Sequence, residues 1–119
     1  MLVWHGKLWL IDHGAALYFH HSSADYGARA TSPFPAIKDH VLLTLANDLD
    51  AVDAAMAAHL TSERIAAITA LIPDDWLDDD PHFADRQAHR AAYADYFAQR
   101  LRAPRAFAEE AARARSVHV

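Results

Sequence analysis

The chain has 119 residues, no cysteine and a formal net charge of -5 at pH 7. The lack of cysteine excludes disulfides, thiolate zinc sites and a cysteine nucleophile, and no stretch approaches the ~18 to 20 uncharged apolar residues of a membrane span. Alanine accounts for 27 residues, so we expect a thin, helix-dominated core. An acidic chain without a secretory pattern is expected in the cytoplasm, and nucleic-acid binding is not expected.

Two short runs of strand-forming residues open the chain. Leu2–Trp4 and Lys7–Ile11 flank the dipeptide His5-Gly6, a pattern typical of a tight β-hairpin. The second run is almost continuously apolar, which predicts a strand that is buried on both faces.

The next segments are less regular. Residues 15–21 fit either a helix or a strand, and residues 22–35 are predicted to be a loop because they contain a glycine and two prolines. From residue 36, Ile37, Val41 and Leu45 recur at a spacing of four. This spacing predicts a helix with one apolar stripe.

Four further helices are predicted at about residues 49–59, 62–72, 83–102 and 105–115. The second has Thr61 or Ser62 as its N-cap and Pro73 as its stop. The apolar stripes of the first three are Val52 and Met56, then Ile65, Ile68 and Ile72, then Ala92, Tyr93, Tyr96, Phe97 and Leu101.

Charge is divided unevenly along the chain. Residues 71–85 carry six aspartates and no basic residue, whereas residues 86–119 carry seven arginines against three acids. The acidic connector at 74–81 lacks the alternating aspartates and central glycine of a calcium loop. We expect a solvated loop pinned to the core by Trp76 and Leu77, followed by helices with a solvated basic face.

One aspartate stands out by its position. Asp12 follows the apolar second run and lies two residues before Gly14. Its carboxylate fits a metal or phosphate site at a strand end, but from the residues alone a turn residue that caps the next segment is the favoured interpretation.

The histidines suggest another possible site. The pair His20 and His21 could bind zinc only together with His13, His5 or Asp25, because adjacent histidines do not form a chelate by themselves. A histidine-based metal-binding protein is therefore the third functional hypothesis.

The segment from Gly6 to Leu17, which contains Asp-His-Gly, resembles the HipA-like kinases of bacteria, together with residues 18–21, 33–37 and 39–43. The similarity extends through residues 93–97 and 100–105. It implies a mostly helical fold, with a short N-terminal β-hairpin and four to five helices, like the C-terminal lobe of a protein kinase. By this resemblance Asp12 binds the Mg²⁺ that bridges the ATP phosphates, and Gly14 lets the chain turn beneath that cofactor site.

The resemblance is incomplete. A kinase also needs a lysine for the phosphates, an aspartate base and an asparagine metal ligand, and no catalytic residue of this kind is identifiable here, since Lys7 is on the wrong side of the motif. We therefore expect residues 1–119 to be a single partial domain, with Met1 an internal methionine or the start of a remnant, and to be inactive alone. The alternative is a non-catalytic helical interaction module that docks on a protein partner or the missing lobe, or self-associates.

Overall fold

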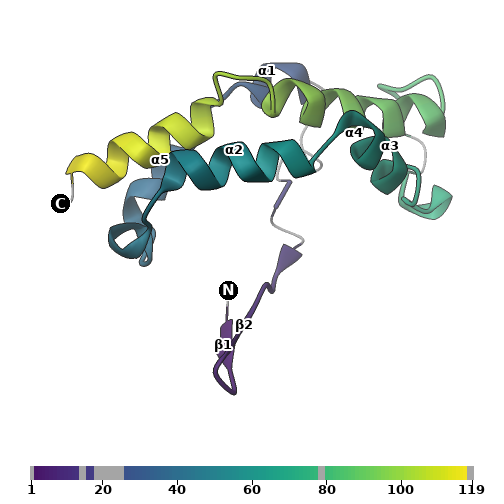
Figure 1. Cartoon of the computed structure of the whole chain (residues 1–119). Coiled ribbons are helices and arrows are strands. Elements are labelled where there is room, and N and C mark those ends of the chain that lie inside the picture. Colours follow the sequence, from purple (N-terminus) through teal and green to yellow (C-terminus); the bar gives the residue numbers. More distant parts are fainter. Residues whose placement is uncertain (1, 14–15, 18–25, 78–79, 118–119) are drawn as a thin grey trace.

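The computed structural model describes residues 2–13, 16–17, 26–77 and 80–117. It consists of a two-stranded hairpin and a helical body (Figure 1). The strands are β1 (Leu2–Trp4) and β2 (Lys7–Trp9), and the α-helices are α1 (Tyr26–Ala30), α2 (Leu49–His59), α3 (Ser62–Thr69), α4 (Arg86–Arg100) and α5 (Ala106–Val117). Short 3₁₀ turns lie at Pro35–Asp39, Leu43–Leu45 and Asp74–Trp76. The prediction of a mostly helical chain that begins with a hairpin is confirmed.

The hairpin has the predicted two-residue turn. β1 and β2 are antiparallel, with Leu2 opposite Trp9. His5 and Gly6 both have left-handed backbones, with φ of 50° and 71°. Two successive positive φ values define a type I′ turn, whose twist matches that of the strands it joins.

The predicted burial of the second run is wrong. We call residues 2–11 the arm; its seven large apolar side chains, at positions 2, 3, 4, 8, 9, 10 and 11, are 46% to 67% exposed. The arm stands away from the helical body (Figure 1), so no second layer covers either face. The radius of gyration, 16.2 Å, exceeds the ~13.5 Å of a compact domain of this length.

The helical body is built on three contacts between helices. α2 and α5 lie side by side, while α1 and α3 both pack on α4 (Figure 1). A cluster of buried residues lies between α1 and α4 and contains Tyr26, Ala30, Leu77, Tyr93 and Tyr96. Among the described residues no large side chain is less than 2% exposed, so the expected thin core is confirmed.

Two of the predicted helices keep their expected starts. α2 has the predicted bounds, and α3 begins after Thr61, whose hydroxyl accepts a hydrogen bond from the Arg64 backbone N–H at 3.3 Å. The predicted apolar stripe of α3 is only partly buried, because α3 packs against α4 on one side. Ile65 is buried, whereas Ile68 is 59% exposed.

The helix predicted from residue 36 is wrong. Two 3₁₀ turns replace it, separated by His40 in an extended conformation (φ −75°, ψ 123°). A 3₁₀ turn repeats every three residues, so the spacing of four no longer marks one face. Val41 and Leu45 are accordingly 86% and 72% exposed, and Leu43 is buried instead.

The loop predicted at 22–35 contains a short helix, α1. Tyr26 and Ala30 lie one turn apart and are both buried against α4, so tertiary packing overrides the helix-breaking tendency of Gly27. The loop prediction is wrong for these five residues, and residues 22–25 lie outside the described part of the chain.

Several arginines expected on a solvated face instead connect elements of the body. Arg90 donates to the Ile72 carbonyl at 2.6 Å, and Arg100 donates to the carbonyl of the last residue of α1 at 3.1 Å. Arg105 holds both carboxylate oxygens of Asp53 through its Nε, at 2.8 and 2.7 Å. These three guanidinium groups therefore link elements of the helical body to one another.

Candidate functional site

Asp12 lies where the arm joins the body, and its backbone is left-handed, with φ of 62°. Only a few per cent of non-glycine residues adopt such a φ, with aspartate among the more tolerant types. The side chain is exposed. Its exposed carboxylate therefore sits at a bend of the chain. The second strand was predicted to reach Ile11, but β2 ends at Trp9, so Asp12 lies three residues beyond the strand end.

The next residue, His13, lines an apolar cavity of about 620 Å³. We call this cavity the groove. Its other principal walls are Ile68 within α3, Ile72 just beyond the end of α3, Trp76, and Tyr93 and Phe97 of α4. Its size and apolar lining are those of ligand and docking sites. The groove was not predicted from the sequence, because it forms between segments far apart in the chain.

The described residues do not form a complete metal site. Among them, no three histidine, aspartate or glutamate side chains gather closely enough to hold an ion. Gly14, His20, His21 and Asp25, which belonged to the expected sites, lie outside the described residues. Proteins bind Mg²⁺ through one or two carboxylates together with phosphates and water, so Asp12 fits one ligand position of a Mg²⁺–nucleotide complex.

The acidic connector is held by local contacts. Asp74 pairs with Arg90, whose guanidinium lowers the pKa of that carboxyl. The His82 backbone N–H, at 3.0 Å, and the His82 ring lower the pKa of Asp80. Of the two residues expected to pin the connector, only one does so.

That residue is Leu77, which is 4% exposed. Trp76 is 71% exposed and lies on the rim of the groove. Trp76 ends the 3₁₀ turn and Leu77 follows it, and the sequence alone did not show which of these two neighbours is buried.

A buried aromatic cluster around His89 was missed in the sequence. The His89 Nε2 lies 3.1 Å from the Tyr26 hydroxyl, and the imidazole stacks on Phe83 and Tyr93 with centroids 4.1 and 5.3 Å apart. Burial raises the pKa of the Tyr93 hydroxyl. His89, Tyr93 and Tyr96 follow the i, i+4, i+7 spacing of one helix face, a signal that could have found the cluster, which fastens α1 to α4.

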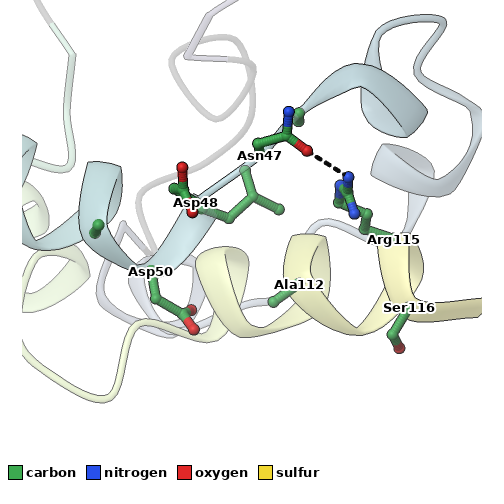
Figure 2. Close-up of a pocket in the computed structure, with 9 residues that line it drawn as sticks. Asn47, Asp48, Asp50, Ala112, Arg115 and Ser116 are labelled. Atoms are coloured by element: carbon green, nitrogen blue, oxygen red, sulfur yellow. Dashed lines mark hydrogen bonds between the residues drawn. The ribbon is translucent and has the colours of Figure 1, made fainter. Parts of the chain in front are cut away.

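A second hollow, of about 670 Å³, lies where α2 begins and α5 ends (Figure 2). Arg115 donates to the Asn47 side-chain oxygen at 2.7 Å across it. Asp48 and Asp50 also line the hollow, and their negative charges disfavour an anionic ligand beside the guanidinium. The Arg115–Asn47 hydrogen bond links the end of α5 to the residues before α2. It places no nucleophile beside a base, so the hollow offers no catalytic pair among the described residues.

No described helix is both long and apolar enough to cross a bilayer. Compared with known protein families, with curated proteins and with solved structures, the chain matches none of them. The functional argument therefore depends on the residues and their geometry.

Proposed function

We propose that this chain is the helical lobe of a HipA-like phosphotransferase, in which Asp12 contributes one ligand to Mg²⁺ bound with ATP. The observation that carries the proposal is the exposed carboxylate of Asp12 on a left-handed residue that directly follows the apolar arm. Sparsely populated backbone conformations cluster at functional sites. A hard carboxylate at such a bend suits a hard divalent cation.

The remaining chemistry belongs to groups outside this lobe. Transfer of a phosphoryl group needs a lysine on the phosphates and a base for the accepting hydroxyl. His13, next to Asp12, lines the groove, so the carboxylate lies close to the surface of the helical body. In this proposal the lobe supplies position and charge, and it does not transfer phosphate alone.

The proposal is tested by paramagnetic broadening in a two-dimensional amide NMR spectrum with Mn²⁺ and ATP. We expect broadening at residues 11–13 that is lost in Asp12→Asn. The matched control is Asp39→Asn, another exposed aspartate, which should leave the broadening unchanged. Broadening confined to the acidic connector, or unaffected by Asp12→Asn, contradicts the proposal; metal-dependent ATP turnover by the chain alone contradicts its inactivity.

The second candidate function is a non-catalytic interaction module. Its specific support is the arm, whose large apolar side chains are about half exposed or more. Exposed apolar surfaces of this kind are typical of protein-protein interfaces. Retained Mn²⁺ broadening in Asp12→Asn, combined with arm-dependent association, favours this function over the first.

A further inference from the structure

The arm is apolar on both of its faces. Residues directly opposite each other in an antiparallel pair point to the same face, so Leu2 and Trp9 share one face while Val3 and Leu8 share the other. All four are 46% to 67% exposed.

The exposed area is large enough for a stable interface. At roughly 100 Å² of exposed surface for each of the seven large side chains, the arm presents about 700 Å², close to the ~800 Å² that each partner contributes to a standard interface. One face alone offers about half of that. Two arms packed face to face bury only one such face of each copy, whereas in an exchanged pair each copy contributes both an arm and a groove, so that the contact forms twice.

The groove offers a matching surface. At its mouth, Ile68 and Trp76 are 59% and 71% exposed. Asp75, exposed beside Trp76, is negative, whereas the arm carries Lys7 and no acidic residue. Complementary charge contributes orientation and association rate more than affinity.

We propose that two copies of this chain exchange arms, so that one face of each arm packs over the groove of the other copy. The arm joins the helical body of its own chain near His13, which lines the groove. From His13 to the turn of the hairpin the chain spans about 23 Å when extended. Exchange of an identical element is a low-cost route to a symmetric dimer. The inference does not depend on the phosphotransferase proposal, because it uses no property of the Asp12 carboxylate.

The test is sedimentation velocity over a range of protein concentrations. We expect a reversible dimer, with its dissociation constant raised at least tenfold by Trp9→Asp in the arm and by Ile68→Asp in the groove. Both side chains are exposed in the single chain, so the variants should fold. Val41→Asp is the matched control, since Val41 is 86% exposed and lies in neither surface; it should change the constant less than twofold.

Mixing the two variants distinguishes arm exchange from other dimers. Trp9→Asp keeps an intact groove and Ile68→Asp keeps an intact arm, so a mixed dimer retains one complete contact and should form more readily than either variant alone. All three tryptophans lie on the arm or the groove, so their emission should shift to shorter wavelength as the dimer forms. A monomer at all concentrations, or normal dimerisation of Ile68→Asp, overturns the inference.

Discussion

Leu77 and Leu71 allow the same substitution to be made at a buried and an exposed site of one region. Leu77 is 4% exposed within the core cluster, whereas Leu71, just after α3, is 79% exposed. Neither residue lies within an α-helix, so replacement by alanine brings no difference in helix propensity at either site. Leu77→Ala should therefore be strongly destabilising and Leu71→Ala nearly neutral.

The magnitudes follow from burial. Full burial of a leucine side chain stabilises by about 1.5 to 3 kcal/mol, and the cavity left by alanine raises the cost of such substitutions to about 2 to 5 kcal/mol. This core is thin, so the site can partly collapse, and we expect a loss of about 2 to 3 kcal/mol for Leu77→Ala. Leu71 keeps roughly a fifth of its surface buried, which gives about 0.3 to 0.6 kcal/mol.

The assay is equilibrium unfolding in urea at pH 7, followed by far-ultraviolet circular dichroism at low protein concentration. Leu77→Ala should lower the midpoint by roughly 1 to 2 M with an unchanged slope. Equal losses for both variants, or a loss below about 1 kcal/mol for Leu77→Ala, would refute the assignment of Leu77 to the core.

Three further predictions concern the hairpin and two ionisable side chains. Gly6→Ala should reduce hairpin population, measured by amide chemical shifts, because Gly6 has φ of 71° even though no atom crowds a Cβ there; unchanged shifts would contradict this. Arg90 lowers the pKa of Asp74, so the pair stabilises the fold above the ordinary pKa of an aspartate, and this contribution is lost as the pH falls through the lowered pKa. Asp74→Asn should therefore lower the urea midpoint at pH 7, and the midpoints of the variant and the parent should converge near pH 2. Burial raises the pKa of Tyr93, so above about pH 10 the Tyr93 hydroxyl ionises in the unfolded chain but not in the folded one, and the stability should fall. The melting temperature should therefore fall less steeply from pH 9 to 11 in Tyr93→Phe than in the parent.

The parts of the fold that were predictable depend on local signals. The turn at His5-Gly6, the cap at Thr61 and the α4 stripe around Tyr93 each follow from neighbouring residues. The segment after residue 35 was not predictable by spacing, because a 3₁₀ turn and an α-helix differ little over five residues. α1 was missed because its stability comes from packing on α4 rather than from its own sequence.

The candidate site divides in the same way. Asp12 was identifiable because its position after an apolar run is a local property. The groove was not, since it joins His13 to side chains of α3 and α4 more than fifty residues away. The burial predicted for the arm was wrong because an apolar sequence indicates that a segment is suited to burial, without indicating which surface buries it.

The arm and the thin core have one consequence in common. A segment that stands away from the helical body adds little to the free energy of unfolding of a single chain, because its apolar side chains are already largely exposed in the folded state. In an arm-exchanged dimer the same segment would be buried, and mass action would make the unfolding midpoint rise with protein concentration. Gly6→Ala should then have no effect on global unfolding at low concentration and should destabilise at high concentration, whereas Leu77→Ala should destabilise equally at both.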